Sequence, residues 1–191
     1  MHTHAARVLL LVVLLGACRP PRPSSPLVAV DFIKEFDRAE KRPAEGFSIR
    51  DYEAAGTIRP AIIAVVPSRL TWAIPIPRRA VFRALVACGD APVRVRVGVS
   101  DSRIYEERAA LTVTPSGGWS ELTADLSPYA GWKFSLFYRP DGRTWRVNLS
   151  ADAAGGAPAH LAWATPEILV ASADALEYRK RRLRITRSGA P

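Results

Sequence analysis

The sequence predicts an antiparallel β-sandwich or jelly roll with one helix ahead of it. Three observations lead to this prediction: short segments in which apolar and polar residues alternate, turn-forming Gly, Pro and Asp residues between them, and a single segment of helical periodicity near the N-terminus. Alternation with a period of two indicates strands with one face on a core and the other in water. Strands that follow one another without intervening helices favour a sandwich over a parallel sheet.

Residues 1–17 are typical of a signal peptide. A short polar start precedes an unbroken apolar run at residues 8–15, which is shorter than the roughly 20 apolar residues that a membrane-spanning helix needs. The segment LGAC, which ends at Cys18, then fits a lipobox, in which the cysteine is cut free and lipidated. We therefore expect lipid chains on Cys18 to hold an exported protein at a bacterial cell membrane or outer membrane. The alternative is an ordinary signal peptide in which the cysteine is incidental.

The same cysteine also begins CRPPR, which fits the C-x-P-x-R pattern by which sulfatases are recognised. In a sulfatase this cysteine matures into the catalytic formylglycine, beside a divalent metal held by carboxylates and amides of a large α/β domain. An apolar signal segment supplies no such oxygen ligands. We interpret the match at Cys18 as coincidence.

Residues 18–27 form a Pro-rich tether, which should stay extended and semi-rigid. The next segment, VAVDFIKEFDRAEK (residues 28–41), predicts a helix that Asp31 caps at its start. Its apolar residues recur at helical spacing and should pack on the body of the protein. They are Phe32, Ile33, Phe36 and Ala39.

The main domain is expected over residues 28–172, with strands from residue 59 onward. Its clearest strand is VRVRVGV (residues 93–99), where four valines face inward while Arg94 and Arg96 face solvent. A slip of one residue in register would bury both arginines, which is costly for unpaired charges. The same alternation assigns to the core Trp72, Phe82, Cys88, Phe134, Leu136, Trp145, Val147 and Trp163.

The formal net charge is +9. For an exported protein this charge favours anionic lipid head groups, lipopolysaccharide or acidic glycans as partners over nucleic acid, and a basic surface without a specific partner is the alternative. Residues 173–191 contain a basic cluster that predicts an exposed tail, a frayed helix or a linker. If Cys18 is lipidated, Cys88 has no cysteine partner in the chain, and we expect it to be a small buried hydrophobic residue.

The sequence contains no recognisable catalytic or cofactor-binding motif, so we predict a protein that is not an enzyme and has no cofactor. His160 is the one histidine outside the signal segment, and no serine or cysteine motif accompanies it. Neither a Cys/His metal spacing nor a Gly-rich phosphate loop is present. The segment SDSRIYEER (residues 100–108) carries Asp101, Glu106 and Glu107. It fits a Ca²⁺ or sugar loop, but we favour a solvated loop.

A candidate ligand surface surrounds Trp132, which follows the turn PYAG. A sugar-binding surface needs a flat apolar ring beside charged hydrogen-bonding groups, and Arg139, Asp141 and Arg143 supply such groups nearby in the sequence. The alternative is a tryptophan that covers the edge of the sandwich.

The order of the predicted segments along the chain resembles that of a known accessory domain. The segments that carry the likeness are VDFIKEFDRAEKR, then TIRPAIIAVVPSRLTWAIPIPRRAVFRALVA, then GGWSELTADLSPYAGWKFSLFY, and finally AWATPEILV. Together they resemble the galactose-binding-like jelly-roll domain that precedes the catalytic domain in some exported bacterial sulfatase-like proteins. The likeness covers residues 28–170, and its motifs are structural rather than catalytic.

The resemblance implies a non-catalytic accessory module. In that family a sulfatase domain would follow the basic segment, whereas this chain stops at Pro191. Two functions are therefore expected as alternatives. The first is a membrane-anchored binding or interaction module for glycans, envelope components or an envelope protein. The second is the truncated or split N-terminal part of a sulfatase-like hydrolase whose catalytic domain is missing here.

Overall fold

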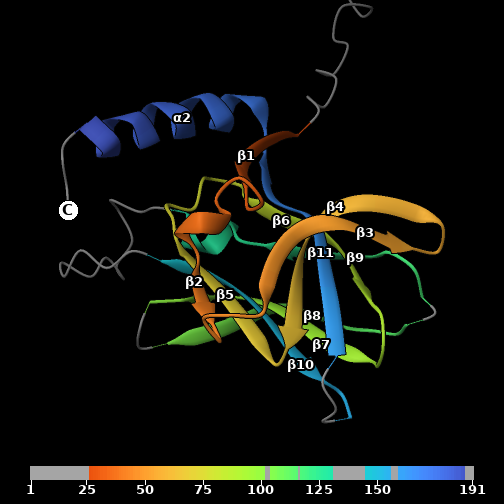
Figure 1. The fold of residues 1–191 in the computed structure, drawn as a ribbon. Coiled ribbons are helices and arrows are strands. Elements are labelled where there is room, and N and C mark those ends of the chain that lie inside the picture. The colour runs from red at the N-terminus through yellow and green to blue at the C-terminus, as the bar shows by residue number, and fades with distance from the viewer. Residues whose placement is uncertain (1–25, 102–103, 116, 131–144, 156–158, 188–191) are drawn as a thin grey trace, which may run out of the picture.

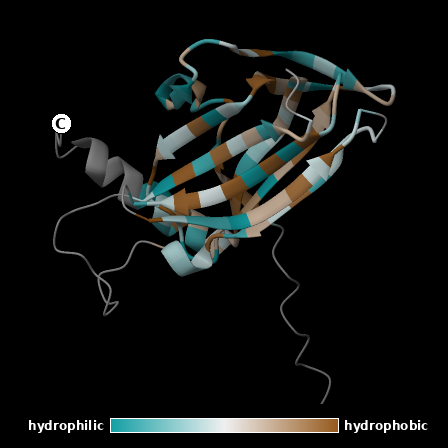
Figure 2. Ribbon diagram, turned by 90° about the horizontal axis from the view of Figure 1, so that it is seen from below, coloured by the Kyte–Doolittle hydropathy of each residue, from teal (hydrophilic) through white to brown (hydrophobic). Residues whose placement is uncertain are grey.

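The computed structural model describes residues 26–101, 104–115, 117–130, 145–155 and 159–187. Within these residues the chain forms two antiparallel sheets, with one α-helix at the C-terminal end (Figure 1). The predicted antiparallel β-sandwich is confirmed. Hydrophobic and hydrophilic residues alternate along several strands (Figure 2), as expected where one face of a sheet lies on a core.

The strands divide between two sheets that we call A and B. Sheet A has the order β3-β4-β11-β6-β9, with β1 paired to β11 off this path. Its strands are β1 (Leu27–Asp31), β3 (Phe47–Ala54), β4 (Thr57–Val66), β6 (Val81–Cys88), β9 (Ser120–Asp125) and β11 (Ala159–Val170). Sheet B has the order β2-β5-β10-β7-β8. Its strands are β2 (Glu40–Arg42), β5 (Ser68–Ala73), β7 (Val93–Ser100), β8 (Tyr105–Val113) and β10 (Arg146–Ala153).

Strand β7 has the register that the sequence predicts. Its four valines are fully buried between the sheets, and Arg94 is exposed. Burying each valine side chain contributes about 1.5 to 3 kcal/mol. The Arg96 side chain is only 28% exposed, since β7 lies between two other strands of sheet B and Arg96 forms an ion pair with Asp152 of the adjacent strand β10. The prediction that Arg96 points away from the core is therefore right, but its side chain is not free in solvent.

The aromatic core joins the two sheets. Phe32 lies between Trp72 of sheet B and Phe82 of sheet A, with ring centroids 4.6 Å and 6.0 Å away. Other predicted core residues are also buried: Cys88, Val147 and Trp163. Trp145 is only partly buried and packs against the edge of this core, whereas Phe134 and Leu136 lie outside the described residues.

The prediction of a helix at residues 28–41 is wrong. The segment instead forms strand β1, a turn, a short 3-10 helix (Phe36–Arg38) and strand β2. The reason is tertiary: β1 pairs with β11 along Leu27–Asp31, which satisfies its backbone through the sheet. Asp31 does accept local backbone bonds from Ile33 and Lys34, at 3.1 and 3.3 Å, but these bonds hold a turn rather than a helix start.

The apolar stripe of the same segment does pack on the body of the protein. Phe32 is fully buried, while Ile33, Phe36 and Ala39 are partly buried against the main core. The indole N–H of Trp72 donates to the backbone carbonyl of Glu35 at 2.9 Å and fixes the turn. These apolar side chains therefore reach the core as predicted, but they are held there by a turn and not by a helix.

The α-helix among the described residues is α2 (Ser172–Arg187), at the C-terminal end and not the N-terminal end. All of it except Ser172 lies in the segment 173–191, for which the sequence predicts an exposed tail, a frayed helix or a linker. Ala175 and Tyr178, three residues apart, are buried, and Asp174 pairs with Arg79 at 2.8 Å. These contacts dock the first turns of the helix. No helix in the described part of the chain combines the length and the apolarity that crossing a membrane requires.

The outer face of sheet A is covered by the chain itself. The β3–β4 hairpin reaches across this face, and the indole N–H of Trp119 donates to the Thr57 carbonyl at its tip, at 2.9 Å. Tyr52 of the hairpin packs edge-on against Trp119, with centroids 5.9 Å apart. Beneath them lies a second small apolar cluster of Ala61, Ile63, Ala162 and Ala164, all buried. The three alanines of this cluster leave room for the hairpin to approach closely.

Candidate functional site

The outer face of sheet B carries a set of polar side chains around one tyrosine. Cross-strand pairing places these residues side by side: Arg69 with Ser150, Thr71 with Asn148, Asn148 with Gly98, and Ser100 with Tyr105. They alternate along their strands with residues of the core. We call this surface the Tyr105 face and define it by Arg69, Thr71, Gly98, Tyr105, Asn148 and Ser150.

The tyrosine ring lies directly over a glycine. A Cβ added at Gly98 would come within 2.6 Å of the ring and hydroxyl atoms of Tyr105, so only glycine leaves room for this arrangement. Tyr105 is nevertheless 43% exposed. The ring therefore lies flat enough on the sheet to touch its backbone, while part of it remains open to solvent.

Arg69 approaches the ring from the other side of the face. Its Nε donates to the Ser150 hydroxyl at 3.3 Å, and its guanidinium carbon lies 5.9 Å from the Tyr105 ring centroid. Within the described residues no carboxylate pairs with Arg69. A cation–π contact at this distance is weak, so the guanidinium has donors available for another group.

A chain of hydrogen bonds forms the floor of the Tyr105 face. The Thr71 hydroxyl donates to Asn148 Oδ1 at 2.9 Å, and Asn148 Nδ2 donates to the Ser100 hydroxyl at 3.0 Å and the Arg146 carbonyl at 3.1 Å. Asn148 is only 3% exposed. Because an unpaired buried amide costs about 1 to 3 kcal/mol, these bonds fix its orientation.

Ion pairs surround this floor. Arg96 pairs with Asp152, and Arg94 lies 3.4 Å from Glu107. On the β2 side, Glu40 accepts from both Arg42 and Arg146, at 2.5 and 3.3 Å. Exposed pairs of this kind contribute about 1 kcal/mol or less each, since water screens them. Their arginines can exchange partners at small cost.

Burial raises the pKa of the Tyr105 hydroxyl above its usual value of 10, although the nearby charge of Arg96 acts in the opposite direction. The phenol therefore stays protonated at physiological pH and can both donate and accept a hydrogen bond. An open ring face, a phenol and a guanidinium are groups that bind a polyhydroxylated molecule such as a sugar. The buried amide chain of Asn148 supports them from beneath.

The residues predicted from the sequence as a ligand surface cannot be compared with this face. Trp132, Arg139, Asp141 and Arg143 lie outside the described residues, as does the predicted lipidation site Cys18. The described chain stops at Ala130 and resumes at Trp145. The rings of Tyr129 and Trp145 pack edge-on with centroids 5.1 Å apart, so the two ends of the intervening segment lie close together.

Among the described residues of the segment 100–108, the three carboxylates each have a partner other than one another. The Asp101 carboxylate accepts from the Ile104 backbone N–H at 2.9 Å, and Glu107 faces Arg94. Glu106 instead pairs with Arg108 at 2.6 Å and accepts a hydrogen bond from the Tyr129 hydroxyl, which lowers its pKa. Within the described parts of the chain, no group of three or more His, Cys, Asp and Glu side chains could hold a metal ion.

His160 and Cys88 do not form a catalytic arrangement in the described residues. His160 Nδ1 lies 2.7 Å from Asp90 Oδ2 on an exposed edge, and a triad would also need a nucleophile within reach of the ring. Cys88 is buried, its thiol donates to the Val113 carbonyl at 3.3 Å, and burial raises its pKa. A buried thiol of raised pKa is unreactive.

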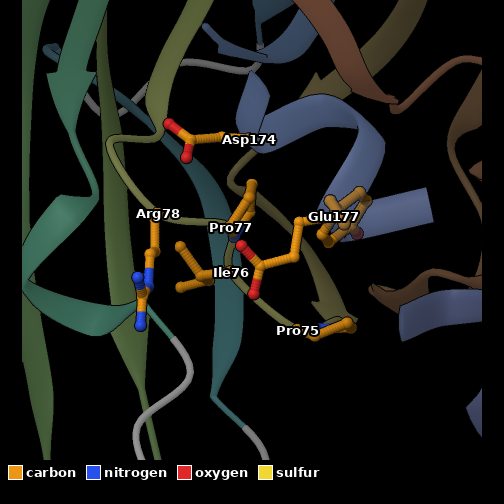
Figure 3. A pocket seen from close by; sticks show the side chains of 7 residues that line it. Pro75, Ile76, Pro77, Arg78, Asp174 and Glu177 are labelled. Carbon is orange, nitrogen blue, oxygen red and sulfur yellow. The ribbon is translucent and has the colours of Figure 1, made fainter. Parts of the chain in front are cut away.

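A small pocket open to solvent lies between α2 and the segment that follows β5 (Figure 3). Pro75, Ile76 and Pro77 form one wall, and Asp174 and Glu177 of α2 lie on the other side. Asp174 is already paired with Arg79. We therefore interpret this pocket as part of the contact by which α2 packs on the sandwich. We assign the ligand site to the Tyr105 face instead.

The sequence contains one signal for this face that the alternation alone does not reveal. In VRVRVGVS, the outward positions carry Arg94, Arg96 and then Gly98. A glycine inside an otherwise regular strand often marks a close approach by another group. The approaching ring is Tyr105, from the segment that the sequence predicts to be a solvated loop.

No family model matches the chain, and no curated protein sequence matches it. Solved structures do share its fold. An exo-β-agarase aligns with a TM-score of 0.50 at 13% identity, over 75% of this chain and 24% of the agarase chain. CBM51-2, solved with GlcNAc and INT domains from Clostridium perfringens ZmpB, aligns at 0.48 and 14% identity, over 70% of this chain and 30% of that chain.

A third solved structure is TmCBM61 in complex with β-1,4-galactotriose, with a TM-score of 0.46 and 10% identity over 74% of this chain and 97% of that one. The chain thus spans less than a third of the ZmpB and agarase chains that it matches. At such identities the likeness shows the fold alone, a β-sandwich. None of these three is a sulfatase-like protein, so that part of the resemblance stays a prediction.

Proposed function

We propose that this protein is a non-catalytic, membrane-anchored lipoprotein whose β-sandwich binds glycans of the cell envelope through the Tyr105 face. The observation that carries the proposal is the arrangement of Tyr105 over Gly98, beside Arg69 and above the hydrogen-bonded amide of Asn148. The outer face of sheet A offers no comparable surface among the described residues, because the β3–β4 hairpin covers its apolar cluster.

The chemistry of the Tyr105 face supports a sugar ligand. A sugar presents C–H groups on one side of its ring and hydroxyls around its edge. The open face of Tyr105 fits the first, while the Arg69 guanidinium and the phenol fit the second. The fold is one that carbohydrate-binding modules also have, but the proposal rests on the residues of this face.

The anchoring part of the proposal rests on the segment LGAC at the end of an apolar run. Lipid on Cys18 would place residues 18–26 of the Pro-rich segment between the membrane and the domain, which begins with β1 at Leu27. Such a tether holds a binding face away from the bilayer, where envelope polymers are within reach.

The binding claim is tested by titrating the purified protein with a panel of bacterial and plant polysaccharides. Tyr105→Ala should weaken binding by about 2 kcal/mol, or about 30-fold in Kd, as removal of a central aromatic side chain does at many interfaces. The matched control is Ile58→Ala, which removes a 63% exposed apolar side chain from sheet A. Unchanged affinity of Tyr105→Ala, or an equal loss in the control, would contradict the proposal.

The alternative of a split sulfatase-like hydrolase is tested by the DNA that follows the codon for Pro191. A reading frame that encodes C/S-x-P-x-R within a metallohydrolase domain would support it. The binding proposal for the Tyr105 face would stand in either case.

A further inference from the structure

We propose that the ligands of the Tyr105 face are acidic polysaccharides, whose carboxylate or sulfate groups pair with Arg69. This inference rests on the proposed glycan-binding function and names the class of glycan. It starts from the charges around the face rather than from its ring.

The charges that line the outer face of sheet B are unequal. Cross-strand pairing places five arginines there, namely Arg42, Arg69, Arg94, Arg96 and Arg146, but only the three carboxylates Glu40, Glu107 and Asp152. Arg42 and Arg146 share Glu40, whereas Arg94 and Arg96 each have one acidic partner. Arg69 is left with the neutral Ser150 hydroxyl. Two positive charges therefore remain uncompensated among the described residues of this surface.

The uncompensated charge lies where a ligand on the ring would meet it. Arg69 is exposed, and its guanidinium carbon is 5.9 Å from the centroid of Tyr105. A sugar stacked on the ring would carry its ring substituents within a few ångströms of that guanidinium. A planar guanidinium binds carboxylate or sulfate through two parallel N–H bonds, and such charge-assisted bonds are about twice as strong as neutral ones.

Arg96 adds a second positive charge to the same surface. One of its terminal nitrogens pairs with Asp152, whereas its Nε is buried and closed to a ligand from solvent. Arg96 is also among the charges that act on the Tyr105 hydroxyl. Cross-strand pairing places Arg69 and Arg96 on either side of Ser150, so the charge of Arg96 adds to that of Arg69 on this surface.

An anionic membrane offers similar charge, so the ligand has to be chosen on other grounds. The Tyr105 face combines an open ring with a phenol and the fixed amide of Asn148 beneath. The ring and its phenol match the C–H face and the hydroxyls of a sugar, which a lipid phosphate lacks, while the buried amide keeps the surface beneath them in place. We therefore assign an acidic glycan, and a lipid surface is an outcome of the test.

The test compares two forms of one polymer, with its carboxylates free or methyl-esterified. Polygalacturonate is titrated against its fully methyl-esterified form by calorimetry, at 50 and 200 mM salt, with the full chain and the variants Arg69→Gln and Tyr105→Ala. The control variant is Arg50→Gln, which removes an exposed arginine from sheet A. Urea midpoints of all variants establish that each is folded.

We expect the acidic polymer to bind at least 10-fold tighter than its ester at low salt. Arg69→Gln should lose most of that preference, because its affinity for the acidic polymer falls much more than its affinity for the ester, and Arg50→Gln should keep both affinities. If the two polymers bind with equal affinity and Tyr105→Ala loses affinity for both, the acidic preference is overturned and glycan binding stands. Absence of binding to any polysaccharide, in this titration or in the wider panel, would overturn the glycan-binding function itself.

A vesicle arm separates glycan from lipid. Wild type and Arg69→Gln are compared on phosphatidylglycerol and phosphatidylcholine vesicles, and any contribution from the N-terminal segment is common to both. Equal partition of the two proteins supports the glycan assignment. A loss of binding to phosphatidylglycerol vesicles in Arg69→Gln, without binding to polygalacturonate, would overturn it in favour of a membrane surface.

Discussion

Replacing Gly98 by alanine should move Tyr105 without unfolding the domain. The new Cβ would lie 2.6 Å from the ring and hydroxyl atoms of Tyr105, whereas carbon atoms prefer about 3.5 to 4.0 Å. The ring must therefore shift outward by about 1 Å or more. Tyr105 begins β8 at the edge of sheet B and is 43% exposed, so its side chain can turn into solvent while the strands stay paired.

The expected change in the free energy of unfolding is small. Alanine within a strand is favoured over glycine by about 0.5 to 1 kcal/mol, and this gain offsets part of the packing energy that the ring gives up when it moves away from the sheet. We expect a net change of about 1 kcal/mol or less in a urea titration. The displaced phenol should become better solvated, and its pKa should fall from its raised value toward 10.

The assay is an NMR titration of protein with ¹³C-labelled tyrosine rings, with Tyr105→Phe to assign the signal. Gly155→Ala is the matched control, because a Cβ at Gly155 would meet nothing within 4 Å. A Tyr105 pKa that stays raised in Gly98→Ala would contradict the close approach of ring and backbone. Destabilisation well above 1 kcal/mol would show that the ring cannot yield and would refute the reasoning.

Three further predictions concern the core, the alkaline limit of stability and the anchor. Val95→Asp should destabilise the sandwich by about 4 kcal/mol or more, because it buries an unpaired charge, whereas Arg94→Glu on the exposed face should change stability by about 0.5 kcal/mol or less; equal urea midpoints would contradict the register. Burial and a hydrogen bond to Glu106 raise the pKa of Tyr129 to about 12. Because this pKa is raised above the value of about 10 in the unfolded chain, the protonated phenol stabilises the fold below pH 10, and this stabilisation is lost toward pH 12. The free energy of unfolding should fall by at most about 2.5 kcal/mol over this range, and Tyr129→Phe should not show the fall. Radiolabelled palmitate should be incorporated into the wild type and not into Cys18→Ala, and labelling that survives this substitution would exclude the anchor.

The strands could be predicted from the sequence where one face is buried. The alternation of residues 93–99 defines the register of β7, because every inward residue is apolar and a slip would bury arginine. The N-terminal helix could not be distinguished from a strand followed by a turn. Phe32, Ile33 and Phe36 have helical spacing, yet the partner that makes β1 a strand is β11, more than 130 residues away in the sequence.

The candidate site was harder to predict for the same reason. Tyr105, Arg69 and Asn148 come from three strands, and only the cross-strand register brings their side chains together. Their residue types are ordinary for strand positions that point away from the core. Gly98 was the local signal, but a glycine in a strand indicates that some group lies close without saying which one.

The location of the binding site is the claim that one measurement tests most directly. A ¹⁵N-edited NMR titration with a short oligogalacturonate would follow the backbone amides and the Asn148 side-chain amide. We predict that the largest shifts occur at Gly98, Tyr105 and Asn148, with a Kd that rises in Arg69→Gln. Shifts confined to the β3–β4 hairpin, or to residues 131–144 that include Trp132, with the Tyr105 face unchanged, would contradict this account.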